Sequence, residues 1–335
     1  MWLLALSLLA LADEPALAPT DVPADAPVAL ELASEQPALP SIEALIDEAR
    51  GRIREADFEG AGLMLNSAAA RAATPQEVVA VRYFQGIVLE LEGRLPDALR
   101  VYEDTAQAYQ GVRAQDLQFR RAEVLGSMGR YDDAIASVDA LGEVDDEADR
   151  AKVALVRAIW QLQGGDVPGG RDAIAQALAH TAPADATYYQ AKAHAIWAQS
   201  LVAESRERSL DVSPRKQVRA LEARAVLMKA TEEHIVAVAN LGEVEWILDG
   251  LITLGQGYTD VGDALLTARP PRKIARRQDR LAAYNAALRG RAEVVWTKAH
   301  GYYVRGRDTA LAHRWHGARV DAIEPAIADV EARFQ

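Results

Sequence analysis

Three histidines near the C-terminus have the residue type and spacing that a metal site would require. His313 and His316 are three residues apart, so on a helix they would share one face, and His300 precedes them. No His-Glu-x-x-His pattern or carboxylate triad accompanies them, and Arg314 adds positive charge beside them. Zinc or copper binding is the alternative, but we interpret these residues as structural or surface histidines and predict no metal site.

Phosphate binding and nucleophilic catalysis have even weaker support. The glycine-rich stretch 164–170 is not followed by the Lys-Ser or Lys-Thr of a phosphate-binding loop, and no Gly-x-Ser-x-Gly pattern occurs. Acidic pairs such as Asp145-Asp146 and Glu232-Glu233 are adjacent, so their side chains do not face each other on a helix. We therefore predict no catalytic residue, no cofactor and no enzymatic activity.

One basic run stands out in an otherwise acidic chain. It begins at Arg269, follows Pro270-Pro271 and places cations near an expected helix start, where the helix dipole disfavours them. It is either a solvated helix start or a docking site for an acidic partner or an envelope anion. We name Arg272 and Arg276 as candidate partner-binding residues within the run, whose cations are Arg269, Arg272, Lys273, Arg276, Arg277 and Arg280.

Composition narrows the fold class and the partners. Half of the 335 residues are apolar but only 6% are aromatic, which favours many small helix–helix contacts rather than a sheet core. The net charge of −12 repels nucleic acid, so we predict no nucleic-acid partner. The absence of cysteine excludes disulfides and a lipid-modified N-terminal cysteine.

The first twelve residues have the pattern of a signal peptide. The stretch from Trp2 to Leu11 is apolar except for Ser7, and Ala10-Leu11-Ala12 is a small-x-small cleavage site. As a helix this stretch is too short to cross a bilayer. It lacks a basic n-region, since the first basic side chain is Arg50. We predict cleavage after Ala12 and export to the periplasm without a lipid anchor or remaining membrane span; a buried or disordered apolar tip is the alternative.

Residues 13–40 have the composition of a disordered spacer. They contain six acidic residues and no basic one, so they can neither pack a core nor hold a helix. The prolines that interrupt this stretch are Pro15, Pro19, Pro23, Pro27, Pro37 and Pro40.

From Ser41 onward the pattern becomes helical and repeats itself. In the clearest copy, small residues at Gly86 and Ala98 allow two helices to approach closely, and Gly93 permits the turn between them. Tyr102 supplies apolar surface that one hairpin cannot bury alone. This segment, 83–102, resembles the tetratricopeptide repeat.

The same frame recurs along residues 41–183. Gly129, with Tyr131 and Ala134 after it, lies 36 residues after Gly93, and Ala56 lies 37 residues before Gly93. Gly165 lies a further 36 residues on, in a glycine-rich stretch that should loosen its turn. The resemblance implies an all-α fold, in which tetratricopeptide-type hairpins stack into a right-handed α-solenoid.

Residues 184–335 are also helical but less regular. We expect helices over 186–207, 215–240, 243–267, 274–302 and 307–333, with degenerate repeats. The segment that contains Glu245-Trp246, Gly255, Tyr258 and Pro270-Pro271 is similar to the C-terminal helical region of tetratricopeptide proteins from the envelope of gliding bacteria. This resemblance covers roughly 90 residues.

In this family the first helices of successive repeats line a concave groove, whose exposed positions contact ligands. The Lys/Asn clamp of well-known members is missing, so a receptor for peptide C-termini is not implied. Tyr83 and Phe119 are either exposed anchors or core. The positions that match the groove are Ile46, Arg50, Arg54, Tyr83, Ile87, Glu90, Phe119, Glu123, Lys152 and Leu155.

The resemblance and the leader together predict a non-catalytic scaffold or adaptor of the bacterial envelope, one that binds other proteins, including envelope components. A motility assembly is one such setting. Two alternatives stay open: an accessory or hydrolytic enzyme domain in 184–335, and a self-associating structural protein of undetermined oligomeric state.

Overall fold

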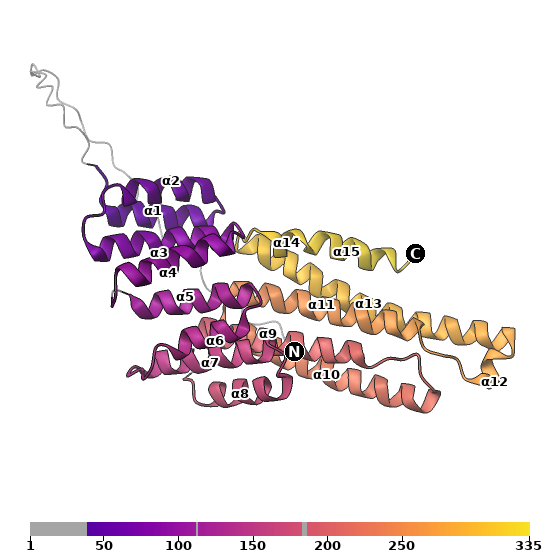
Figure 1. Ribbon diagram of the computed structural model, residues 1–335. Coiled ribbons are helices and arrows are strands. Elements are labelled where there is room, and N and C mark those ends of the chain that lie inside the picture. Colours follow the sequence, from indigo (N-terminus) through magenta and orange to yellow (C-terminus); the bar gives the residue numbers. More distant parts are fainter. Residues whose placement is uncertain (1–38, 112, 183–185) are drawn as a thin grey trace, which may run out of the picture. The chain divides into compact units, whose positions relative to one another are not determined.

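All regular secondary structure in the part of the chain that is described is α-helical (Figure 1). The computed structural model describes residues 39–111, 113–182 and 186–335. The helices are α1 (Ile42–Arg54), α2 (Phe58–Ala69), α3 (Pro75–Leu91), α4 (Leu95–Ala108), α5 (Ala114–Ser127), α6 (Tyr131–Asp139), α7 (Glu147–Gln163), α8 (Val167–Ala179), α9 (Thr187–Glu207), α10 (Pro214–Leu241), α11 (Val244–Leu266), α12 (Arg272–Ala275), α13 (Gln278–Ala312), α14 (Ala318–Asp321) and α15 (Ile323–Ala332). The predicted all-α, helical-repeat solenoid fold is confirmed.

The first eight helices form four antiparallel hairpins, and their turns lie at the expected spacing. Ala56, Gly93, Gly129 and Gly165 all have positive φ, which ends the first helix of each hairpin. In the first three turns an N–H just past this residue donates to a carbonyl five residues earlier, as from Arg94 to Leu89 at 2.8 Å. The fourth turn is different, because there the N–H of Val167 donates to the carbonyl of Gly165 at 2.9 Å.

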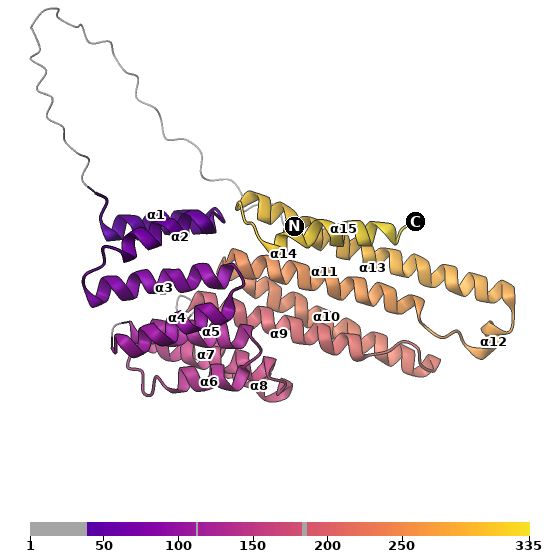
Figure 2. The same ribbon diagram turned by 45° about the horizontal axis from the view of Figure 1, so that its top comes forward.

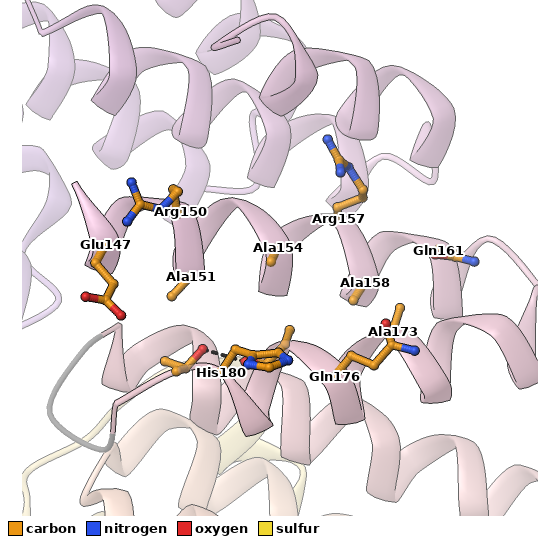
Figure 3. A pocket seen from close by; sticks show the side chains of 12 residues that line it. Glu147, Arg150, Ala151, Ala154, Arg157, Ala158, Gln161, Ala173, Gln176 and His180 are labelled. Atoms are coloured by element: carbon orange, nitrogen blue, oxygen red, sulfur yellow. Dashed lines mark hydrogen bonds between the residues drawn. The ribbon is translucent and has the colours of Figure 1, made fainter. Parts of the chain in front are cut away.

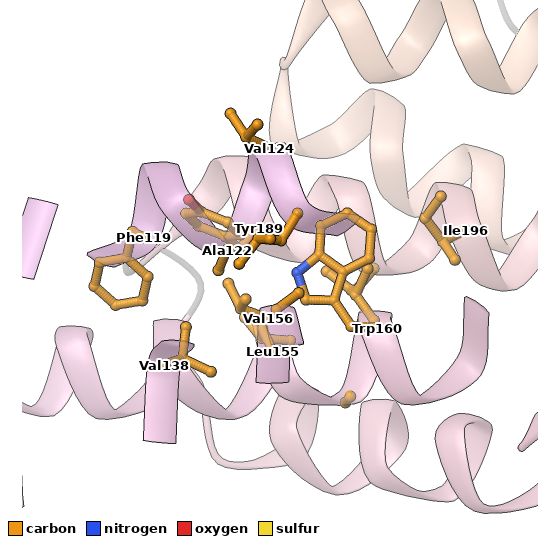
Figure 4. Close-up of a cluster of buried hydrophobic side chains, with 14 of the residues drawn as sticks. Phe119, Ala122, Val124, Val138, Leu155, Val156, Trp160, Tyr189 and Ile196 are labelled. Carbon is orange, nitrogen blue, oxygen red and sulfur yellow. The ribbon is translucent and has the colours of Figure 1, made fainter. Parts of the chain in front are cut away.

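Small residues let the two helices of each hairpin approach closely. A Cβ atom at Gly86 on α3 would overlap the ring of Tyr102 on α4, and Ala98 and Ala134 are fully buried. Tyr131 on α6 stacks on Trp160 of α7, with ring centroids 6.2 Å apart. Contacts of this kind continue from hairpin to hairpin, and they build one core cluster from α3 to α9 (Figure 4).

Four longer helices, α9, α10, α11 and α13, follow the hairpins and lie side by side (Figure 2). Glycines on α11 permit this packing: Gly250 contacts Ile235 of α10, and Gly262 contacts the indole of Trp296 on α13. The clusters around these contacts also include Tyr302 and Tyr303. Residues Pro40–Gln335 form one compact unit.

The expected break in the last long helix was misplaced. The sequence predicted separate helices over 274–302 and 307–333, whereas α13 continues from Gln278 to Ala312. Gly301 and Gly306 stay helical, and Gly306 is buried on the side that approaches Ile323. The chain turns at Arg314 and Gly317 instead, where φ is positive.

Several predictions concern residues that the structure does not describe. The signal peptide 1–12 and nearly all of the spacer 13–40 lie outside the described residues, and the boundary at 183/184 falls in the gap 183–185. Among the helices that are described, none is both long and apolar enough to span a membrane.

Candidate protein-binding surfaces

The expected groove positions of the middle repeats are core residues. Phe119 is 1% exposed, so the second of its two interpretations, a core residue, applies; Leu155 is fully buried and does not line an open surface (Figure 4). The Nζ atom of Lys152 lies 3.6 Å from the centre of the Phe119 ring, and Tyr189 of α9 covers it from 6.2 Å. Side chains from α7 and α9 therefore occupy the place that a ligand would take.

Glu90 forms a part-buried ion pair between adjacent repeats. Its carboxylate accepts hydrogen bonds from Nε and Nη2 of Arg120 on α5, at 3.1 and 3.0 Å, and from the hydroxyl of Tyr102 at 2.5 Å. Burial raises the pKa of Glu90, although Arg120 and the Tyr102 hydroxyl oppose this shift. Burial also raises the pKa of Tyr102, so its hydroxyl stays protonated and donates. These groups join α3, α4 and α5 and leave Glu90 little capacity for a partner.

Glu123 is likewise used inside the molecule. It is 8% exposed and pairs with the ammonium group of Lys192 on α9. That ammonium group also lies 4.2 Å from the ring centre of Trp160 and 5.7 Å from that of Trp246. The other carboxylate oxygen of Glu123 and both indole N–H groups are buried with no protein hydrogen-bond partner among the described residues. The expectation of an exposed contact at Glu123 is therefore also wrong.

The remaining groove positions are partly or fully accessible. Tyr83, Ile87 and Lys152 are half-buried, and the guanidinium carbon of Arg113 lies 4.8 Å from the ring centre of Tyr83. Burial lowers the pKa of Lys152.

In α1, by contrast, two of the expected groove residues reach solvent. Arg50 and Arg54 are exposed, and Arg50 pairs with Asp47 at 3.0 Å. Ile46, also expected to line the groove, packs against the core clusters of the first hairpin. Of the predicted contact residues on the repeats, only these two arginines are therefore well exposed.

An open groove of about 540 Å³ runs between α7 and α8 (Figure 3). Its α7 side presents Ala151, Ala154 and Ala158 toward α8, and its α8 side presents Ala173 and Ala177. The polar residues around this alanine floor are Glu147, Arg150, Arg157, Gln161, Gln176, His180 and Thr181.

The helix before α7 takes no part in the groove: α6 has nine residues against the 17 of α7, and none of them lines the groove. Arg157 donates from Nε to Asp139 at the end of α6, at 2.9 Å. Arg150 donates to the carbonyl oxygens of Val144 and Asp145 in the loop that follows, at 3.0 and 2.6 Å. Both arginines hold the preceding repeat and point away from α8, so they do not fill the groove (Figure 3).

A second open groove, of about 390 Å³, lies where α2, α3 and α4 meet. Phe58, Leu63, Leu89 and Val101 line it, and Leu63 is 60% exposed. Its apolar side chains are larger than the alanines of the α7–α8 groove, but its lining also includes two acidic residues, Glu59 and Glu92.

The basic run is exposed, as a docking interpretation requires. Arg272 lies on the short helix α12, and Arg276 follows that helix directly; both are exposed. This run is far in sequence from the groove positions on the repeats and adjoins the N-terminal end of α10, because the side-chain amide of Gln217 donates to the carbonyl of Arg269 at 2.8 Å.

The candidate metal residues are dispersed in the structure. His313 follows the last residue of α13 and His316 lies in the turn after it, so they do not share a helix face. His300 contacts Glu331 at 3.1 Å. Within the described residues, no group of three or more His, Cys, Asp or Glu side chains is arranged to hold a metal ion.

Sequence reasoning missed a histidine pair between α9 and α10. The Nδ1 atoms of His194 and His234 lie 2.9 Å apart, and the His234 ring packs 4.4 Å from Trp197. Burial lowers the pKa of His194; burial, with smaller contributions from His194 and Arg171, lowers that of His234 to about 4. The two residues are 40 positions apart and belong to no motif, so no sequence signal pointed to them.

It also missed a cluster centred on Glu232. This carboxylate accepts hydrogen bonds from the hydroxyls of Tyr258 and Tyr302, at 2.9 and 2.6 Å, and pairs with Lys298 at 2.5 Å. Burial alone would raise the pKa of Glu232, but these three donors lower it. Burial raises the pKa of both tyrosines, which is the opposite of what a phenolate nucleophile needs. The cluster ties α10, α11 and α13 together.

Comparisons with known proteins found a similar solved structure but no matching family. No family model and no curated protein matches the chain. Among solved structures, the chain is similar to a tetratricopeptide repeat protein from Parabacteroides merdae, with 14% sequence identity and a TM-score of 0.40. This similarity covers 87% of this chain and 98% of that one. The helical-repeat fold stands on the hairpin turns and packing described above.

Proposed function

We propose that this protein is a non-catalytic scaffold that binds a helix of a partner protein in the α7–α8 groove. The observation that carries the proposal is the open alanine floor of that groove, whereas the expected groove positions Phe119, Glu123 and Leu155 are closed by internal packing. Small residues permit helix axes to approach within about 8–10 Å. A partner helix with a narrow apolar ridge and polar flanks would fit an alanine floor with a polar rim.

Two observations favour this groove over the predicted concave face. The concave positions of the middle repeats are occupied by Phe119, Glu123 and the side chains that cover them, so a ligand would have to displace buried ion pairs. Ala154, in contrast, is exposed at the centre of the α7 side of the groove. Binding there would add apolar contact without breaking an internal interaction.

The proposed setting is an exported envelope assembly. It is supported by the signal-peptide pattern of residues 1–12 and by the sequence resemblance of the C-terminal region to envelope tetratricopeptide proteins, which makes a motility assembly the narrower proposal. Fractionation with N-terminal sequencing tests it: the mature chain should be periplasmic and begin near Asp13. A cytoplasmic, full-length product would refute the export proposal and leave the groove proposal standing.

Scaffolding is favoured over an enzyme domain in 184–335 because the charged clusters found there join helices. Glu232, Tyr258, Tyr302 and Lys298 bond to one another across three helices, and both grooves described above lie on the N-terminal repeats. A self-associating structural protein is the other alternative. Analytical ultracentrifugation distinguishes it, since self-association alone would give a defined oligomer without any other protein.

Site-specific photocrosslinking tests the groove directly. A benzoylphenylalanine side chain at position 154 should capture a partner in native extracts, and one at the exposed Ala175 on α8, outside the groove lining, should not. Ala154→Trp should fill the groove and abolish capture by an independent affinity tag, whereas Ala175→Trp should leave it unchanged. Equal capture by both tryptophan variants would refute the groove as the binding surface.

A further inference from the structure

The structure brings a second group of cations beside the basic run. Gln217 bonds to the carbonyl of Arg269 at 2.8 Å, and Asp211 pairs with the Arg269 side chain at 3.1 Å. The start of α10 therefore adjoins the connection between α11 and α13. We call this surface the basic tip; its cations are Arg215, Lys216, Arg219, Arg269, Arg272, Lys273, Arg276, Arg277 and Arg280.

The basic tip is exposed and lacks internal neutralisation. All nine cations are exposed, and the same two stretches, 211–222 and 269–280, contain only three carboxylates, at Asp211, Glu222 and Asp279. Of the nine, only Arg269 has an ion-pair partner among the described residues. Carboxylates in the neighbouring turns are already paired: Asp260 with Arg206 and Asp263 with Arg333.

Local helix stability does not explain these charges. Arg215 and Lys216 lie in the first turn of α10, and Arg280 lies in the first turn of α13, where the helix dipole makes cations unfavourable. Carboxylates at the far ends of the long helices do not cancel the field of these cations either, because salt screens charges at that distance. α10 alone extends for 28 residues, or about 42 Å, several times the Debye length of about 8–10 Å.

Exposed aliphatic side chains lie among the cations. Val218, between Lys216 and Arg219 on α10, is 58% exposed, and Leu266, near the end of α11, is 46% exposed. The Gln217–Arg269 hydrogen bond holds these two helix ends against each other. The surface therefore combines a dense array of guanidinium groups with two apolar side chains that face water.

We propose that the basic tip binds an anionic phospholipid surface. Guanidinium groups match phosphate oxygens in geometry and charge, and a bilayer also accepts shallowly inserted aliphatic side chains. A nucleic acid offers the same phosphates but no use for exposed Val218 and Leu266. This surface is separate from the α7–α8 groove, so a helix-binding scaffold would be held at a membrane by the end of its long helices.

Vesicle cosedimentation of the purified chain tests the proposal. The chain should bind vesicles of equimolar phosphatidylglycerol and phosphatidylcholine, release with added salt, and leave pure phosphatidylcholine vesicles unbound. Arg272→Gln with Arg276→Gln should weaken binding roughly fivefold per cation, hence on the order of 25-fold. The matched control, Arg54→Gln with Arg82→Gln, removes two exposed cations from α1 and α3. It should change binding less than twofold, because salt screens cations that lie more than a Debye length from the bilayer.

Two further results separate the membrane from other polyanions. Leu266→Ser should weaken vesicle binding severalfold but leave binding to a DNA duplex unchanged, since only the bilayer takes up the aliphatic side chain. The proposal is overturned if the control pair loses as much binding as the tip pair, if neutral vesicles bind equally well, or if DNA binds more tightly than anionic vesicles at equal salt. None of these results bears on photocrosslinking at position 154.

Discussion

Charged side chains at the expected contact positions serve the interior of the molecule. Glu90 pairs with Arg120, Glu123 with Lys192, and Lys152 covers the Phe119 ring. A charge removed from water needs a partner, because burying it alone costs several kcal/mol. These contacts therefore join α3 to α5, α5 to α9 and α7 to α5 instead of contacting a ligand.

The Glu123–Lys192 pair should be costly to break on one side only. Lys192→Met leaves a buried carboxylate without its partner and should lower the free energy of unfolding by about 3–5 kcal/mol. Changing Glu123→Met as well should restore most of this loss, because two apolar side chains then pack together. Urea denaturation of the single and double variants measures both effects; a single variant within ~1 kcal/mol of wild type would contradict the pairing.

Two helical glycines should respond in opposite directions to the same substitution. Gly86→Ala places a methyl group against the Tyr102 ring and should destabilise the chain by about 1–3 kcal/mol. Gly62→Ala on α2 meets no atom within 4 Å and should stabilise it by about 0.5–1 kcal/mol through helix propensity. Thermal melts of the two variants compare them; equal shifts would mean that the close approach of α3 and α4 is absent.

At the scale of elements, small residues line both the open groove and the tightly packed helix contacts. Alanines of α7 and α8 form the floor of the α7–α8 groove, and no residue of the short α6 lines it. The glycines of α11 have the opposite effect, because they let α10 and α13 pack tightly against it. The α9–α10 contact contains the His194–His234 pair, whose pKa values are lowered mainly by burial.

The histidine pair should make stability depend on pH. In the unfolded chain both rings titrate near pH 6.5, whereas in the folded chain the pKa of His234 is about 4. Between these two pKa values the unfolded chain binds more protons than the folded chain, so the free energy of unfolding should fall as the pH falls. Since the rings keep some solvent contact, we expect a loss of about 1–2 kcal/mol rather than the full linkage value.

Urea denaturation at about pH 7 and about pH 5 tests this expectation, and His234→Gln supplies the comparison. The variant should lose less stability on acidification than wild type, while His180→Gln, at an exposed histidine, should behave as wild type. Identical pH dependence in wild type and His234→Gln would show that the pair stays solvated.

At the scale of the whole molecule, the C-terminal segment fastens the long helices. Ile323, Ile327 and Val330 of α15 pack in one cluster with Trp296 and Tyr303 of α13. Two arginines add ion pairs to α11: Arg319 to Glu245 at 2.8 Å and Arg333 to Asp263 at 2.9 Å. This segment therefore joins α11 and α13 although it comes last in the chain.

Truncation after Ala312 should loosen the long helices while sparing the hairpins. Each of the three buried aliphatic side chains contributes roughly 1.5–3 kcal/mol, so the loss should exceed several kcal/mol locally. Hydrogen exchange should then accelerate in α11 and α13, while α1–α6 keep their protection. Uniform acceleration over the whole chain would instead show that Pro40–Gln335 unfolds as one cooperative unit.

The repeat register and the helical class could be predicted from sequence because they depend on local chemistry. Small residues such as Gly86 and Ala98, and a turn residue such as Gly93, recur every 36–37 residues. The turn residues Gly93 and Gly129 have the positive φ that ends a first helix. Helix ends were harder: a break was expected between 302 and 307, but α13 stays helical there, and Gly306 lies against Ile323.

The candidate sites depended on tertiary structure. Sequence register assigns Phe119 and Glu123 to one face of α5, but it does not show what covers that face, and the covering residues Tyr189 and Lys192 are about 70 positions away. The α7–α8 groove forms where alanines of two helices face each other, and the basic tip includes Arg215 and Lys216 because Gln217 meets the carbonyl of Arg269. Local sequence thus determined which helices form and where they turn, whereas burial and exposure were decided by contacts between segments that only folding brings together.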